Sequence, residues 1–158
     1  MRVLLNRFKE PIYKDDLINV LLYGLLNSIV FSMLSGAVQF FLNVYLRLEF
    51  GILVYLIAYM IGKITSAKVF NKHILYSIIL ELFFILGLFV YSVTWYSFVF
   101  HDVLFGFLYV FSGTGIINAV FPYLNIYTYQ GINILYNIID LAIVICSMIT
   151  IWRFMNKN

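Results

Sequence analysis

Long apolar runs separated by short polar segments dominate this chain. Four of the runs are close to the length of about 20 residues that a helix needs to cross the hydrocarbon core of a bilayer. We therefore predict an all-α, polytopic integral membrane protein. Its four transmembrane helices are expected at residues 17–42, 49–67, 74–96 and 131–152, within a single domain of residues 17–158 that follows a basic cytoplasmic segment of residues 1–16.

Composition narrows the functional classes. Of the 158 residues, 64% are hydrophobic and 11% are charged, which excludes soluble enzymes, zinc ribbons and nucleic-acid-binding modules. The only cysteine, Cys146, lies in an apolar run, so it forms neither an intramolecular disulfide nor a cysteine metal cluster. His73 and His101 are predicted on opposite sides of the membrane, so they cannot share a metal ion. We expect no metal site and no cofactor.

The first 16 residues combine basic and apolar side chains ahead of the first apolar run. The basic residues are Arg2, Arg7, Lys9 and Lys14. No short apolar region with a small-x-small cleavage site follows, so an uncleaved signal anchor is predicted. This segment is expected to be either a short helix on the cytoplasmic leaflet or a frayed tail.

The apolar segment 103–124 leaves the number of spans open. If it does not cross, nine of the ten Lys and Arg residues lie on one side of the membrane; if it crosses, Arg153 and Lys157 change sides and seven remain. The positive-inside rule therefore favours four spans in the plasma membrane with both termini cytoplasmic, and five spans is the alternative. We predict a re-entrant or interfacial helical hairpin at 103–124. Its protein-covered tip consists of Ser112, Gly113, Thr114 and Gly115.

Small residues recur every four positions in the first two predicted spans. This spacing puts them on one helix face and lets two helix backbones approach closely. The residues are Gly24, Ser28, Ser32 and Gly36 in the first span, and Ala58, Gly62 and Ser66 in the second. These faces are expected to pack helices within one bundle or, alternatively, to join copies in a homo-oligomer.

Two acids fall inside predicted spans, Glu81 in the third and Asp140 in the last. A carboxylate at such a depth costs at least about 2.5 to 3.5 kcal/mol on insertion scales, so each needs a partner or a proton. If spans two and three form an antiparallel hairpin that turns near Phe70, Lys63 and Glu81 differ in depth by only about 6 Å. An ion pair between them is expected, either to fix the register of the hairpin or as a titrating site for a proton or cation.

A polar stripe on the last span surrounds Asp140. Its members share one helix face; they are Asn133, Asn137, Asp140 and Ser147. The face is expected to point into the bundle, where a neutral Asp140 would donate a hydrogen bond to an Asn or to Gln39 of the first span. Hydrogen bonding between helices is favoured over chemistry, because no nucleophile, base and orienting group can be placed together. No catalytic residue is predicted.

The stretch from Asn19 to Tyr91, with Leu48–Leu53 followed by Ile61-Gly62-Lys63 and a basic loop, resembles a broad group of bacterial four-span membrane proteins without an assigned activity. Pro122 and the pair Trp152-Arg153 extend the resemblance to the C-terminal part. It implies the topology, and it implies no site residue.

These observations lead to two functional hypotheses. The first is a non-enzymatic bacterial membrane protein that acts by association with itself or with a partner protein, as an accessory, immunity or defence component. The alternative is a small oligomeric channel or a proton- or cation-coupled carrier that uses Glu81 and Asp140. The expected partners are the lipid bilayer and either a second copy or another membrane protein, without nucleic acid.

Overall fold

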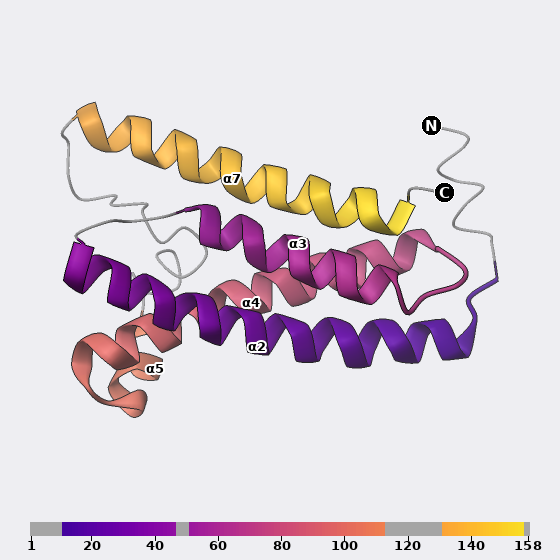
Figure 1. Ribbon diagram of the computed structural model, residues 1–158, viewed down its shortest axis with the longest axis horizontal. Helices are drawn as coiled ribbons and strands as arrows, with labels where there is room; N and C mark the ends of the chain where they lie inside the picture. Colours follow the sequence, from indigo (N-terminus) through magenta and orange to yellow (C-terminus); the bar gives the residue numbers. More distant parts are fainter. Residues whose placement is uncertain (1–10, 47–50, 113–130, 157–158) are drawn as a thin grey trace.

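The computed structural model describes residues 11–46, 51–112 and 131–156, except for the side chains of residues 131–137 and 140. Every regular element in this part of the chain is an α-helix, which confirms the all-α class there (Figure 1). The helices are α2 (Lys14–Leu46), α3 (Ile52–Ser66), α4 (Ile74–Phe100), α5 (Val103–Phe111) and α7 (Gly131–Asn156).

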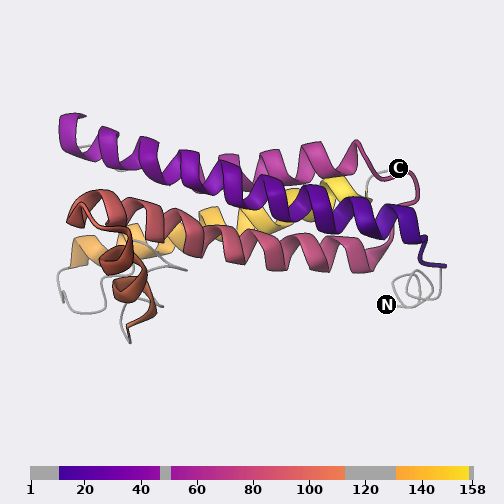
Figure 2. The same cartoon turned by 90° about the horizontal axis from the view of Figure 1, so that it is seen from below.

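Four of the helices form a bundle, and α5 lies at one end of it (Figures 1 and 2). Helices α2 and α7 each pack against both α3 and α4, whereas α3 and α4 contact each other much less. α2 and α4 run in the same direction, and α3 and α7 run in the opposite one. The starts of α2 and α4 therefore lie at the same end of the bundle as the ends of α3 and α7.

Helix α2 has polar and small residues inside and apolar residues outside. Its buried residues are Asp16, Val20, Gly24, Asn27, Ser28, Ser32, Ser35, Gly36 and Gln39. Its exposed residues include Leu22, Leu26, Val30, Met33, Leu34 and Val38. A surface helix of a water-soluble protein shows the opposite distribution, with its apolar stripe facing the core.

Two helices of the described part are long and apolar enough to cross a membrane, α2 and α4. Helix α3 has 15 residues, a length of about 22 Å against a hydrocarbon core of about 30 Å.

The boundaries of two helices differ from the predicted ones. Helix α2 begins at Lys14 and takes in the last three residues of the predicted N-terminal segment. At the other side of the bundle α4 continues four residues beyond the predicted end of the third span, to Phe100.

Short-range chemistry sets the limits of α4 and α5. The ring nitrogen Nδ1 of His73 accepts the N–H of Leu75 at 3.0 Å and caps the start of α4. His101 ends α4 in the left-handed region, with φ of 53°. Asp102 then caps α5, because its Oδ1 accepts the N–H groups of Leu104 and Phe105 at 2.7 and 3.3 Å. The chain therefore reverses within two residues, and α5 lies against the end of α4.

The apolar core lies where α3, α4 and α7 meet. Its largest fully buried side chains include Ile57, Ile61, Leu80, Phe84, Leu88, Ile151 and Met155. Large branched and aromatic residues therefore fill the centre of the bundle on this side, whereas small residues occupy the contact between α2 and α4. The difference sets how closely each pair of helices can approach.

Candidate functional site

The small residues of α2 lie against α4. A Cβ atom built on Gly24 would lie 2.5 Å from Cδ2 of Leu80, and one built on Gly36 would lie 2.6 Å from the carbonyl oxygen of Tyr91. The second neighbour is backbone and cannot rotate away. The face predicted from sequence as a packing seam is therefore used between two helices of the same chain, which leaves it closed to a second copy.

Serines complete this contact with a hydrogen bond and a complementary glycine. Ser28 Oγ donates to the carbonyl oxygen of Phe83 across the helix pair. A Cβ atom on Gly87 of α4 would lie 2.7 Å from Ser28 Oγ and 2.6 Å from Ser32 Oγ. Gly87 was not singled out in the sequence. It is the only glycine of α4, and an isolated glycine inside a long helix is the signal that would have indicated a close contact.

The small residues of α3 differ in burial. Ala58 and Gly62 are buried, and a Cβ atom on Gly62 would lie 2.9 Å from Phe154 Cδ2 of α7. Ser66 is only partly buried, and its hydroxyl donates to the carbonyl oxygen of Lys63 in its own helix at 3.0 Å. Thr65, its neighbour, is fully buried instead. The helix that packs on this face is α7. No small-residue face is predicted on α7, so this contact was not expected from the sequence.

One polar residue that the sequence reasoning passed over fixes the start of α2. Asp16 is 3% exposed, and its carboxylate accepts the backbone N–H groups of Phe70 and Asn71, each at 2.9 Å. The Asn71 side-chain amide adds a third bond at 3.2 Å. Asp16 thus ties the first turn of α2 to the loop between α3 and α4. Two acids at the start of a long apolar helix, Asp15 and Asp16, were the available signal.

Further polar contacts gather at the same end of the bundle. The Asn19 side-chain amide donates to the Lys68 carbonyl oxygen at 2.9 Å, and the Tyr76 hydroxyl donates to the Tyr13 carbonyl oxygen at 3.1 Å. The Asn156 side-chain amide of α7 donates to Ser77 Oγ of α4 at 2.8 Å. Helices α2, α4 and α7 are therefore joined at this end by directional hydrogen bonds between residues far apart in the sequence.

The predicted ion pair between Lys63 and Glu81 is wrong. Lys63 is exposed, and its Nζ lies 5.4 Å from the centroid of the Tyr59 ring in the same helix. Glu81 is partly buried in α4. The physical reason is the arrangement of the bundle: α3 and α4 follow each other in the chain, but α3 packs mainly on α7 and α2, and α4 packs mainly on α2 and α5. Equal depth therefore does not bring the two side chains together.

The other polar candidates divide between described and undescribed side chains. Gln39 of α2 is 3% exposed, and Ser147 is buried with its hydroxyl donating to the Ile143 carbonyl oxygen at 2.7 Å. The side chains of Asn133, Asn137 and Asp140 lie outside the described residues. The predicted hydrogen bond of Asp140 therefore stays a prediction.

The predicted hairpin at 103–124 is described only in its first half. Helix α5 covers nine residues, about 14 Å, which is too short to cross a membrane. Ser112 ends it, with its hydroxyl donating to the Tyr109 carbonyl oxygen at 2.7 Å. The remaining tip residues, Gly113, Thr114 and Gly115, lie outside the described part, as do residues 116–124.

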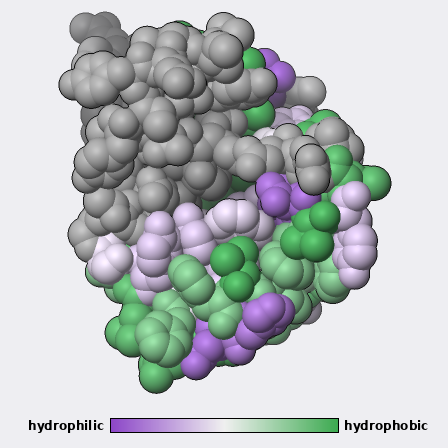
Figure 3. Space-filling view, turned by 90° about the vertical axis from the view of Figure 1, so that its left-hand side faces the viewer, coloured by the Kyte–Doolittle hydropathy of each residue, from purple (hydrophilic) through white to green (hydrophobic). Residues whose placement is uncertain are grey.

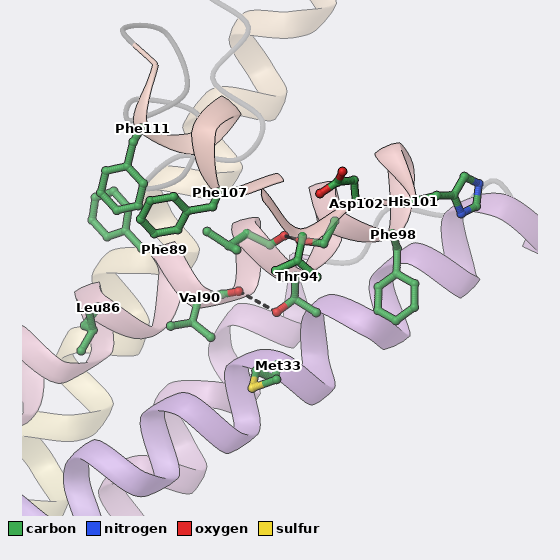
Figure 4. A pocket seen from close by; sticks show the side chains of 13 residues that line it. Met33, Leu86, Phe89, Val90, Thr94, Phe98, His101, Asp102, Phe107 and Phe111 are labelled. Carbon is green, nitrogen blue, oxygen red and sulfur yellow. Dashed lines mark hydrogen bonds between the residues drawn. The ribbon is translucent and has the colours of Figure 1, made fainter. Parts of the chain in front are cut away.

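An apolar groove runs between α2, α4 and α5, with a volume of about 690 Å³ (Figure 4). Phe89, Phe107 and Phe111 gather at one end of it, and Asp102 and His101 lie toward the other. The rings of Phe89 and Phe111 stack with centroids 6.0 Å apart, which joins α5 to α4 at the apolar end. Met33 supplies the contribution of α2. The groove was not predicted, because its walls come from three helices.

Two hydroxyl groups line the groove without making it polar. Thr94 Oγ1 donates to the Val90 carbonyl oxygen at 2.8 Å, and Ser97 Oγ donates to the Val93 carbonyl oxygen at 2.6 Å. Both protons are therefore used within α4. Beyond the groove, hydrophilic residues form small patches among apolar ones on the end surface of the bundle that carries α5 (Figure 3). The groove thus offers an apolar interior with a polar group at its edge, an arrangement that can hold an amphiphilic ligand.

Within the described residues, no group of three or more His, Cys, Asp or Glu side chains is arranged to hold a metal ion. No protein-family model, no curated protein and no solved structure matches this chain.

Proposed function

We propose that this chain is a four-span integral protein of the plasma membrane that acts without catalysis, by association with other molecules in the membrane. The observation that carries the proposal is the distribution of residues on α2. Its buried face is small and polar, and its exposed face is apolar. Such a helix is stable where the surroundings are lipid, because there the outer face needs no polar residues and helix contacts depend on close packing.

The charge distribution supports an orientation. The five described Lys and Arg side chains all lie at the end of the bundle where α2 and α4 begin and α3 and α7 end; they are Lys14, Lys63, Lys68, Lys72 and Arg153. Cytoplasmic segments are enriched in such residues. The proposal therefore puts this end in the cytoplasm and the groove end on the opposite side.

The absence of catalysis is proposed because several of the described polar side chains hold segments of the chain together. Asp16, Asn19 and Ser28 each bond to the backbone of another segment. Thr94 and Ser97 bond to their own helix. What the bundle presents outward is mainly apolar surface, which is suited to contacts with lipid or with another membrane-embedded helix.

Cysteine accessibility tests the topology. In a Cys146→Ser background, single substitutions Phe70→Cys and His101→Cys put a thiol at each end of α4, and both native side chains are exposed. A membrane-impermeant maleimide added to intact cells should label the thiol at 101 and spare the thiol at 70 until the cells are lysed. Labelling of both from outside, or of neither, would contradict a crossing by α4.

The same reagent distinguishes four spans from five. A thiol introduced by Lys157→Cys should be protected in intact cells if the chain has four spans. It should be labelled from outside if there are five. The thiol at position 70 serves as the internal control, because it lies before the segment in question.

Association is tested on the purified protein in mild detergent. Analytical ultracentrifugation, with the detergent contribution matched out, should show a defined complex with a second copy or with a co-purified membrane protein. A clean monomer without a partner at all concentrations would overturn this part of the proposal.

A second function, ion or proton transport, is favoured by one observation. Glu81 lies within the apolar helix α4 and forms no ion pair with a described residue. Acids at such positions often belong to ion or proton pathways. Liposomes that contain wild-type protein should then show proton or cation flux that Glu81→Gln abolishes, with Asp15→Asn at the exposed start of α2 as the control. Liposomes without flux would exclude this function.

A further inference from the structure

We propose that the groove between α2, α4 and α5 binds an acyl chain of a phospholipid whose headgroup carries a primary ammonium, with the Asp102 carboxylate facing that headgroup. The inference rests on the proposed function, since it requires the groove to lie in a membrane. It adds a specific ligand class and a position for each part of the ligand.

The dimensions of the groove suit a single chain. Its volume of about 690 Å³ lies within the range of roughly 300–1,000 Å³ that small ligands occupy in proteins. Along α4 it extends from Leu86 to His101, and fifteen residues of helix measure about 22 Å. One leaflet contributes about half of the roughly 30 Å hydrocarbon thickness. An acyl chain that starts at the level of His101 can therefore follow the groove as far as the membrane midplane.

The interior of the groove selects for a hydrocarbon chain over a polar solute. The hydroxyl protons of Thr94 and Ser97 are already donated to carbonyl oxygens of α4. A polar ligand would therefore leave its own acceptors without partners at a substantial cost, whereas an acyl chain has none to satisfy. Apolar side chains make the remaining contacts; among them are Met33, Leu86, Phe89, Val90, Phe107 and Phe111.

The edge of the groove is acidic and complements an ammonium group. Asp102 is exposed, and its Oδ1 accepts both capping N–H groups of α5, while no described residue donates to Oδ2. None of the described Lys and Arg side chains forms an ion pair with it, since they lie at the opposite end of the bundle. A lipid ammonium would supply the missing positive charge, whereas an anionic headgroup without one would be repelled.

Photolabelling in vesicles tests the position of the chain. The full-length protein is reconstituted into vesicles of equal parts phosphatidylethanolamine and phosphatidylglycerol that contain a trace of phosphatidylethanolamine with a diazirine in its acyl chain. After irradiation, peptide mass spectrometry should find the label concentrated on the groove side of α4 and on α5, around Phe89 and Phe111. Equal labelling of exposed residues outside the groove, such as Leu22 and Leu82, would overturn the proposal.

A substitution that fills the groove with a larger side chain should prevent the lipid from binding there. Val90→Phe puts a ring into the groove and should lower labelling of α5 about tenfold. Val99→Phe is the matched control, because Val99 lies on the same helix, is exposed and does not line the groove. Unchanged labelling in the Val90 variant, with its thermal unfolding like that of the control, would contradict binding in the groove.

Headgroup selection is tested with Asp102→Asn, which keeps a side chain that caps helices well but removes the charge. Wild type should prefer the labelled phosphatidylethanolamine over the phosphatidylglycerol analogue by about two- to fivefold, as expected for an exposed ion pair. The variant should show no preference while total labelling persists, and Asp15→Asn should behave as wild type. Equal labelling of both lipids by wild type would overturn the ammonium assignment.

The experiments distinguish a failure of this inference from a failure of the proposed function. If the protein is removed from membranes by alkaline extraction, the membrane proposal fails and the labelling loses its basis. If the protein resists extraction and the thiols at 70 and 101 report opposite sides, yet the label is spread evenly over the exposed surface, the groove proposal alone fails.

Discussion

The two sides of α4 show opposite ways of packing a helix. Toward α2, glycines and serines bring the backbones so close that added Cβ atoms on Gly36 and Gly87 would approach existing atoms to 2.6 Å. Toward α5, the stacked rings of Phe89 and Phe111 join the two helices, but a groove of about 690 Å³ remains beside them. Small side chains let two helix backbones approach until no space remains between them. Large aromatic rings meet at their edges and leave space between the helices.

The difference indicates a division of tasks. The α2 side carries hydrogen bonds between segments, including those of Asp16 and Ser28, and gives the bundle a defined geometry. The α5 side has an apolar groove with a charged residue at its edge. We expect substitutions on the first side to change stability and substitutions on the second to change ligand binding.

The largest effect is expected from Gly36→Leu. Its Cβ would collide with the Tyr91 carbonyl oxygen, so α2 and α4 would have to separate. We expect a loss of about 3 kcal/mol in the free energy of unfolding. SDS titration in mixed micelles, followed by the fluorescence of Trp95 and Trp152, measures it. Val38→Leu, on the exposed face of the same helix, should change stability little. Equal effects of the two variants would contradict the close contact.

Asp16→Ala should rank second. It removes the buried carboxylate that accepts the N–H groups of Phe70 and Asn71, and these part-buried bonds are worth about 2 kcal/mol together. The same SDS titration applies, and limited proteolysis should show faster cleavage in the loop before α4. Asp15→Ala is the matched control, because Asp15 is exposed in the same turn. A stability equal to the control would show that the contacts of Asp16 do not hold the loop.

Ser28→Ala should have a smaller effect, about 1 kcal/mol. The variant removes the hydrogen bond to the Phe83 carbonyl oxygen and leaves the close approach of the helices intact. Ser32→Ala serves as the comparison, because Ser32 Oγ is buried without a hydrogen-bond partner among the described residues. It should cost less than Ser28→Ala, and the reverse order would contradict the assigned bond.

The smallest effect on stability is expected from Val90→Phe, within about 0.5 kcal/mol of wild type. The added ring enters existing space rather than a packed contact. The sharpest comparison is with Gly87→Ala, a smaller addition on the same helix that faces Ser28 and Ser32 and should cost more. If Val90→Phe is the more destabilising of the two in SDS titration, the groove is not open space and the contrast between the two sides fails.

The sequence predicted some features of the site better than others. The small-residue face of α2 was visible as a four-residue spacing, because residues on one helix keep a fixed geometry. The helix that packs on this face could not be predicted. Whether it is another helix of the same chain or a helix of a second copy depends on how the helices are arranged in space. The prediction of the Lys63–Glu81 ion pair was wrong for the same reason. The position of a residue in the chain gives its depth along the bundle, but it does not give which helices are neighbours.

Asp16 and the groove were missed in different ways. Asp16 is the last residue of the basic segment predicted at 1–16, and only the fold brings the loop at Phe70 and Asn71 to its carboxylate. The groove has no sequence signature, because Met33, Phe89 and Phe107 belong to three helices and are ordinary apolar residues in each. Both depend on contacts between residues more than 50 positions apart or between separate helices.

The sequence by itself determined the helical class of the described chain, the long apolar stretches that become α2 and α4, and the small-residue face of α2. These properties depend on interactions between residues near each other in the chain and on the overall preference for an apolar environment. Only the tertiary structure decided that α2 pairs with α4, that α3 pairs with α7, and that α5 leaves a groove with Asp102 at its edge. Those outcomes depend on how side chains of separate helices fit together, and the pattern along one helix does not contain that information.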